Sequence, residues 1–263
     1  MILNYLLNCF YFLFMILSFG LIIGLIEQKT INYIYTVFGK TGILLSGIIG
    51  TPIHEIGHLV FAILFGHNIK DFKLFPKYKD IETGKLGYIA HSYNSKSFYQ
   101  RLGNFFIGIG PMFSCSISIL ILMKILTPEV YVNILNTIRD TITNNHNFIE
   151  AFYNLIGSLI TNFLNISTLS NIKTYIFLIL AANISSHLSL SISDIKNSLD
   201  GFVFTLIVIA ITSIIIIIIP SIGIIAVNFF KIVNSFCLIL FLFSFIFSLL
   251  NFLVGNLIWK LLS

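Results

Sequence analysis

Long apolar segments are the feature that most restricts how this chain can fold. Hydrophobic residues fill 57% of the 263 positions, and charged residues fill only 10%. A helix needs roughly 20 apolar residues to cross the hydrocarbon layer of a bilayer. Six stretches of about that length follow one another: Ile2–Ile26, Thr41–Phe65, Leu102–Leu126, Tyr175–Ser191, Gly201–Pro220 and Ile232–Trp259. We therefore expect an all-α polytopic membrane protein, in which residues 1–263 form one domain embedded in the lipid bilayer.

The charges between these segments predict their orientation. Residues 67–101 carry seven of the fifteen Lys and Arg residues, whereas residues 127–173 carry two. Short loops rich in Lys and Arg stay on the cytoplasmic side of a membrane. We expect a multi-pass protein of the cell membrane with residues 67–101 and both termini in the cytoplasm and residues 127–173 outside. The basic residues gather in one loop and do not form a binding face, so no nucleic-acid partner is expected.

Two of the connecting stretches show patterns of their own. Residues 70–75 alternate polar and apolar side chains, and residues 86–93 look extended after a turn at Gly84. This pattern predicts a small β-hairpin after the second segment, with a solvated basic loop as the alternative. The edge of such a hairpin can hold an extended peptide. Residues 127–173 are amphipathic, for example at Val130, Ile134 and Ile138, which is typical of helices that lie on a membrane surface.

The second apolar segment contains the sequence His54-Glu55-Ile56-Gly57-His58. Helix positions four apart share a face, so His54 and His58 can bind one metal ion, and Glu55 is placed to accept a proton from a metal-bound water. An acid in the middle of a membrane segment costs about 2.5–3.5 kcal/mol on insertion scales, which favours a functional role for Glu55. The dipeptide Thr51-Pro52 predicts that the helix begins or kinks just before this motif.

A catalytic zinc ion takes three protein ligands and a water, so the motif needs a partner from elsewhere in the chain. The candidates lie in or just after the fourth segment, where polar residues interrupt an apolar run. They are His187, Asp194 and Asp200. On a helix, His187 and Asp194 share a face because they are seven residues apart.

Residues 52–58, the Gly110-Pro111 pair in the third segment and an acid in a later segment together resemble the site-2 protease family of intramembrane zinc metalloproteases. The resemblance covers about residues 41–201, which we take as the core. In that family the third zinc ligand is an aspartate in an Asn-x-x-Pro…Asp-Gly stretch. Here Asn183 has no proline three residues later, and the Asp-Gly pair is Asp200-Gly201. Residues 186–194 are similar to a divergent bacterial branch, which implies Asp194 as the ligand, with Asp200 and His187 as alternatives.

The resemblance implies an intramembrane zinc metalloendopeptidase that cuts membrane-spanning or membrane-associated polypeptides. His54, His58 and Asp194 would hold Zn²⁺, and Glu55 would be the general base. His187 would support Asp194 or a reaction intermediate, and Asn183 would bind the substrate backbone, unless it makes an interhelical hydrogen bond instead. The alternative function is a non-proteolytic metal-binding membrane protein, such as a transporter or an immunity-type factor.

Overall fold

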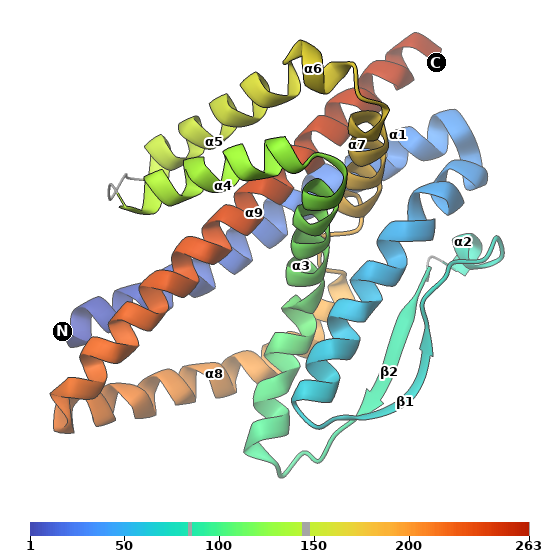
Figure 1. Cartoon of the computed structure of the whole chain (residues 1–263). Helices are drawn as coiled ribbons and strands as arrows, with labels where there is room; N and C mark the ends of the chain where they lie inside the picture. Colours follow the sequence, from blue (N-terminus) through green and yellow to red (C-terminus); the bar gives the residue numbers. More distant parts are fainter. Residues whose placement is uncertain (84–85, 144–147, 263) are drawn as a thin grey trace.

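A computed structural model describes residues 1–83, 86–143 and 148–262 (Figure 1). Nearly all of this chain is helical. The elements are α1 (Ile2–Leu64), β1 (Asn68–Lys73), α2 (Asp80–Thr83), β2 (Tyr88–Ser92), α3 (Phe98–Leu126), α4 (Pro128–Thr143), α5 (Phe148–Phe163), α6 (Ile166–Leu169), α7 (Ile172–Ser185), α8 (Ile192–Ile218) and α9 (Pro220–Leu262).

Within the described residues, four helices are long and apolar enough to cross a membrane: α1, α3, α8 and α9. The chain is therefore an all-α membrane protein with a small antiparallel sheet, as the apolar segments predict. The limits of the six predicted segments differ from those of the helices. The first two segments lie in one helix, and the fourth ends early because α7 stops at Ser185. The fifth begins early, since α8 starts at Ile192, and the sixth forms part of the longer α9.

Helix α1 turns back on itself at Gly39, which has a φ of 60° and a ψ of −151°. Glycine adopts this left-handed region without the steric cost that other residues meet. We call residues 2–38 the first arm and residues 40–64 the second arm. The helix continues through Pro52, so it does not begin just before the histidine motif.

The first arm and α9 lie side by side and run in the same direction (Figure 1). Near one end, the Asn234 amide donates to the Asn8 carbonyl at 2.9 Å. Near the other, the rings of Tyr33 and Trp259 stack with centroids 5.3 Å apart. The long helix at the C-terminus thus braces the arm that precedes the turn.

The second arm packs against α3 in the opposite direction. Where they cross, a Cβ added to Gly57 would lie 2.7 Å from the Gly110 carbonyl carbon. Small residues let helix backbones approach closely in membranes, where packing replaces the hydrophobic driving force. Helix α8 then crosses α3 with similar closeness, because Gly201 lies against the Phe105 backbone.

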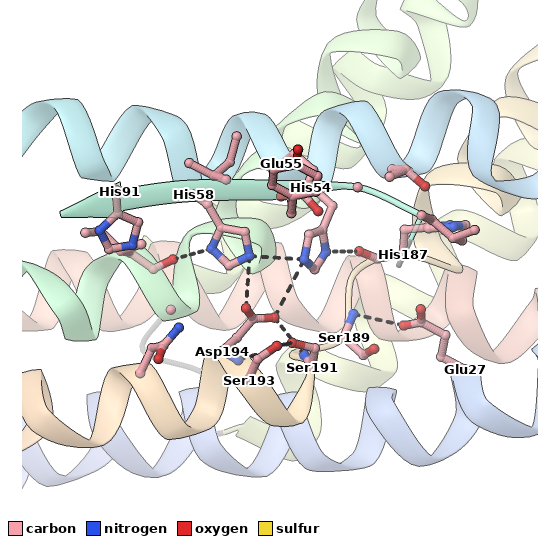
Figure 2. A pocket seen from close by; sticks show the side chains of 18 of the residues that line it. Glu27, His54, Glu55, His58, His91, His187, Ser189, Ser191, Ser193 and Asp194 are labelled. Carbon is pink, nitrogen blue, oxygen red and sulfur yellow. Dashed lines mark hydrogen bonds and ion pairs between the residues drawn. The ribbon is translucent and has the colours of Figure 1, made fainter. Parts of the chain in front are cut away.

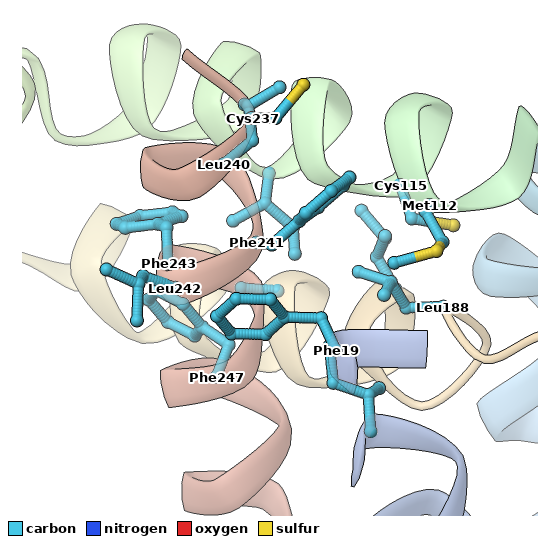
Figure 3. Packing of buried hydrophobic residues seen from close by; sticks show 14 of the residues in the cluster. Phe19, Met112, Cys115, Leu188, Cys237, Leu240, Phe241, Leu242, Phe243 and Phe247 are labelled. Atoms are coloured by element: carbon cyan, nitrogen blue, oxygen red, sulfur yellow. The ribbon is translucent and has the colours of Figure 1, made fainter. Parts of the chain in front are cut away.

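A core of buried side chains joins these helices (Figure 3). It includes Phe19 from the first arm, Met112 from α3, Phe241 from α9 and Leu188 from the linker between α7 and α8. We call residues 186–191 the linker. Because Leu188 is fully buried, this non-helical stretch is held inside the bundle and does not lie on its surface.

The predicted β-hairpin is present, and β1 and β2 pair antiparallel with an irregularity between Ile69 and Asp71. The hairpin does not extend away from the end of the second arm. It folds back and lies along that arm (Figure 1). Pro76 lies beside Gly47, and the Lys40 ammonium is 5.8 Å from the centre of the Tyr78 ring. The hairpin therefore covers the arm that carries the histidine motif.

Candidate metal centre

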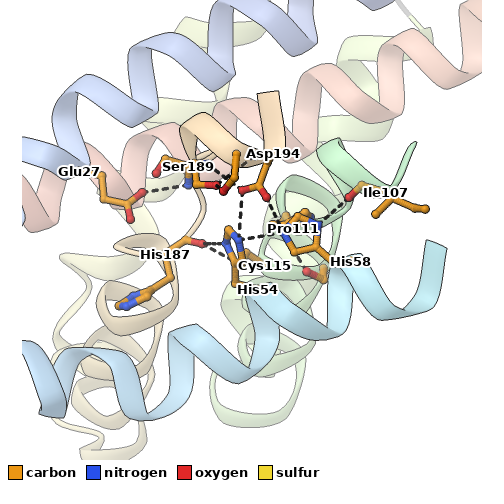
Figure 4. Close-up of polar contacts among 12 residues, drawn as sticks. Glu27, His54, His58, Ile107, Pro111, Cys115, His187, Ser189 and Asp194 are labelled. Carbon is orange, nitrogen blue, oxygen red and sulfur yellow. Dashed lines mark hydrogen bonds and ion pairs between the residues drawn. The ribbon is translucent and has the colours of Figure 1, made fainter. Parts of the chain in front are cut away.

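His54 and His58 project from one face of the second arm, and each ring is oriented by a backbone carbonyl (Figure 4). His54 Nδ1 lies 2.7 Å from the His187 oxygen in the linker. His58 Nδ1 lies 2.7 Å from the Ile107 oxygen in α3. A carbonyl oxygen only accepts hydrogen bonds, so each Nδ1 carries the proton. In the neutral rings, both Nε2 atoms are therefore lone-pair acceptors.

These two Nε2 atoms lie 3.2 Å apart. Two neutral acceptors at that distance repel each other unless a cation or a proton stands between them. Protein ligands that bind one zinc ion are separated by distances of this order, since each zinc–nitrogen bond is about 2.0–2.1 Å. The two rings can therefore share a cation or a proton between their Nε2 atoms.

Asp194 completes the cluster from the first turn of α8. Its carboxylate oxygens lie 3.8 Å from His54 Nε2 and 3.3 Å from His58 Nε2. A capping box fixes this turn, because Ser191 Oγ accepts the Asp194 N–H at 3.1 Å while the carboxylate accepts the Ser191 N–H at 2.8 Å. One ligand atom from each of the three residues lies within 4.8 Å of the others. Two imidazoles and one carboxylate suit a catalytic zinc ion, so these residues fit the metal that the motif implies.

Glu55 points into the same cavity as the cluster, from the next position along the helix (Figure 2). The residue is 7% exposed. Gly87, just before β2, packs so closely that a Cβ there would lie 2.8 Å from Glu55 Oε1. The carboxylate is thus held between the helix and the hairpin, beside the candidate metal ligands.

Asp200 does not join the cluster. Its carboxylate accepts hydrogen bonds from the guanidinium of Arg101 and, at 3.2 Å, from the amide of Asn104. This contact ties α8 to α3, and Gly201 beside it allows the close crossing of the two helices. The Asp-Gly pair therefore helps to hold α8 against α3, and it lies away from the metal residues.

His187 and Asn183 lie near the site, but their contacts differ from those expected. The His187 ring makes no bond to Asp194; its Nδ1 lies 3.3 Å from the Asn183 oxygen, and it is the His187 carbonyl that reaches the site. Asn183 donates to the Leu45 oxygen at 3.1 Å and accepts from the Gly50 N–H at 3.4 Å. Asn183 thus makes the interhelical bond that was the alternative to binding substrate.

Sequence reasoning missed Glu27, a buried acid of the first arm. Its carboxylate accepts the Ser189 N–H at 2.9 Å and so anchors the linker that carries the His187 carbonyl (Figure 4). The sequence signal that could have identified Glu27 is its position, since it is an acid at the end of an apolar run. The spacing Ser191-x-x-Asp194 was a second one, because it matches a capping box.

His91 of β2 was also missed. Burial lowers the pKa of its imidazole to about 4, so the ring is neutral at pH 7. His67 Nε2 lies 2.8 Å from the Gln100 oxygen and carries a proton, which leaves His67 Nδ1 to accept from His91 Nδ1 at 2.9 Å. His91 Nε2 is then the acceptor of the ring, and His91 lines the cavity.

The cavity around these residues has a volume of about 490 Å³. In Figure 2 it runs from His91, past His58 and His54, to Glu27, with β2 lying across it. It is large enough for several water molecules or a short stretch of polypeptide. Comparison with protein-family models, curated proteins and solved structures found no match to this chain.

Proposed function

We propose that this protein is an intramembrane zinc metalloendopeptidase of the site-2 protease type, acting in the cell membrane. The observation that carries this proposal is the arrangement of three side chains from two distant helices. Two imidazole acceptors and the Asp194 carboxylate converge on one point, within a bundle of apolar helices. Glu55 lines the cavity that this point faces.

A bound zinc ion would supply an acidic water and polarise the scissile carbonyl group. His54, His58 and Asp194 would hold it, and the carbonyls of His187 and Ile107 would keep both rings in the required tautomer. Glu55 would accept the proton of the water and pass it to the leaving amine. Gly87 packs against this carboxylate and covers most of it from water, which strengthens its electrostatic interactions.

The free edge of the hairpin is the reason for proposing a polypeptide as the substrate. The described sheet has two strands, so β2 has one edge that pairs with β1 and a second edge without a strand partner. Leu86, Gly87 and Ile89 line the cavity beside Glu55. An extended segment of a membrane protein can add to such an edge through main-chain hydrogen bonds and lie beside the metal residues.

Glu55→Gln tests this function. Membranes from cells that express the wild type or the variant would be compared by mass spectrometry for fragments cut within or near membrane segments. We expect fragments that depend on the wild type and vanish with Glu55→Gln, while zinc content stays similar. Glu129→Gln removes the same charge from an exposed position in α4 and should behave as wild type. Identical fragments in all three samples would contradict the peptidase and favour a non-proteolytic metal-binding protein.

A further inference from the structure

Glu27 is placed at one end of the cavity with unused capacity to bind. In Figure 2 it lies beyond His54, on the side away from His91. The residue is 7% exposed, and it lines the cavity. The Ser189 N–H donates to Oε2 at 2.9 Å, and the Ser189 side chain also interacts with the carboxylate. A carboxylate has about four lone-pair sites, so lone pairs remain for a group in the cavity.

Two further acceptors lie at the same end. His187 Nδ1 lies 3.2 Å from Ser186 Oγ and 3.3 Å from the Asn183 oxygen. The Ser186 hydroxyl donates its proton to that same oxygen at 2.9 Å, so Nδ1 carries the ring proton and Nε2 keeps a lone pair. The Thr51 hydroxyl is buried and has no partner among the described residues. Both side chains line the cavity, and both lie close to Gly47: a Cβ there would be 3.5 Å from His187 Nε2 and 3.1 Å from Thr51 Oγ1. This end of the cavity therefore offers several lone pairs, and the Thr51 hydroxyl can rotate so that its oxygen accepts.

The charges of the cavity lead to the same conclusion. Among the residues that the structure describes, its lining contains three acids, Glu27, Glu55 and Asp194, and no Lys or Arg. A divalent metal ion balances two negative charges, which are those of Asp194 and Glu55 beside it. An ionised Glu27 would then have no counter-ion among the described lining residues, and an unpaired charge inside an apolar bundle is costly, so a bound cation would stabilise the carboxylate form.

We propose that Glu27, with His187 and Thr51, forms a subsite for a cationic group of the substrate, an ammonium or a guanidinium. This inference rests on the proposed function for the nature of the ligand, a membrane polypeptide. A Lys or Arg side chain near the bond to be cut, or a free N-terminus, supplies the required chemistry. Glu27 would thereby select substrates that carry a positive charge within or beside an apolar segment.

Binding of model peptides tests the subsite without any need for cleavage. The background is Glu55→Asp, which keeps the charge of the cavity and withdraws the carboxylate from the reacting position by one methylene. Three fluorescent 20-residue Leu/Ala peptides are titrated onto the zinc-loaded protein in detergent micelles. The first has a central Lys and an acetylated N-terminus. The second has norleucine in place of Lys, and the third has norleucine and a free N-terminus.

We expect the Lys peptide to bind about tenfold or more tightly than the acetylated norleucine peptide, because a desolvated ion pair can contribute that much. In Glu27→Gln this preference should fall below about twofold. The glutamine still accepts the Ser189 N–H, so the linker stays anchored. Glu129→Gln should leave the preference intact. Tight binding of the third peptide instead would assign the subsite to an N-terminal amine. Equal binding of all three peptides, or a preference that survives Glu27→Gln, would overturn the proposal. A failure of the proposed function would appear separately, as wild-type protein that binds but never cuts.

Discussion

Gly87 of the hairpin lies directly against the side chain of Glu55, and this contact joins the sheet to the candidate catalytic residue. A Cβ at Gly87 would stand 2.7 Å from Glu55 Cγ and 2.7 Å from Thr51 Cγ2. Both neighbours belong to the second arm, so neither the hairpin nor the helix has room for a methyl group there. The position of Glu55 in the cavity therefore depends on a residue that has no side chain.

Gly87→Ala should displace either the hairpin or the Glu55 carboxylate. We expect cleavage to fall about 10²-fold, because a misplacement near 1 Å has that effect on catalysis. Zinc content should remain that of the wild type, since the three metal residues do not contact Gly87. Gly157→Ala is the matched control, as nothing lies within 4 Å of a Cβ at that position. Cleavage at the wild-type rate in Gly87→Ala would show that the hairpin does not constrain Glu55.

Gly57→Ala should weaken the crossing of the second arm with α3. The new methyl group would stand 2.5 Å from Ser114 Oγ and 2.7 Å from the Pro111 nitrogen. Overpacking of this kind lowers the free energy of unfolding by about 1–3 kcal/mol. The fluorescence of Trp259, the single tryptophan, would follow unfolding as SDS is added to mixed micelles. No loss of stability relative to Gly157→Ala would contradict the close backbone approach.

The tip of the hairpin should loosen in acid. The Lys73 ammonium pairs with Asp80 and lowers the pKa of that carboxyl below its ordinary value of 3.8, with help from the Lys77 N–H. A carboxyl whose folded pKa is lowered contributes stability above its unfolded pKa and loses it as the pH falls through the folded value. Hydrogen exchange of residues 68–83, corrected for intrinsic rates, should be slower in wild type than in Asp80→Asn at neutral pH. The difference should disappear in strong acid; a constant difference would contradict this assignment.

The histidine motif was predictable because its geometry is local. Helix periodicity alone places His54 and His58 on one face, whatever the rest of the chain does. The hairpin was also predictable, since alternation and a turn are local signals. The first segment was expected to end at Ile26, yet the helix continues to Gly39. No proline or glycine occurs between Glu27 and Phe38, so nothing in the backbone stops the helix earlier.

The rest of the site depends on contacts between distant residues. Asp194 reaches the histidines because α8 crosses α3 at Gly201 and Gly108, which sequence periodicity does not reveal. The serines of the linker compete for backbone hydrogen bonds and end α7 early, so His187 supplies a carbonyl and not its ring. Asp200 was an equal candidate by residue type, and its pairing with Arg101 becomes visible only in three dimensions.

Zinc content per chain tests the central claim most directly. It would be measured on detergent-purified wild type, His58→Ala, Asp194→Asn and Asp200→Asn, each shown to be folded. The account predicts about one zinc ion in the wild type, as one three-ligand site requires. It predicts near-complete loss in His58→Ala, a strong reduction in Asp194→Asn and wild-type content in Asp200→Asn. Folded wild type that takes up no zinc after metal supplementation, or Asp194→Asn that keeps a full zinc ion, would contradict the site.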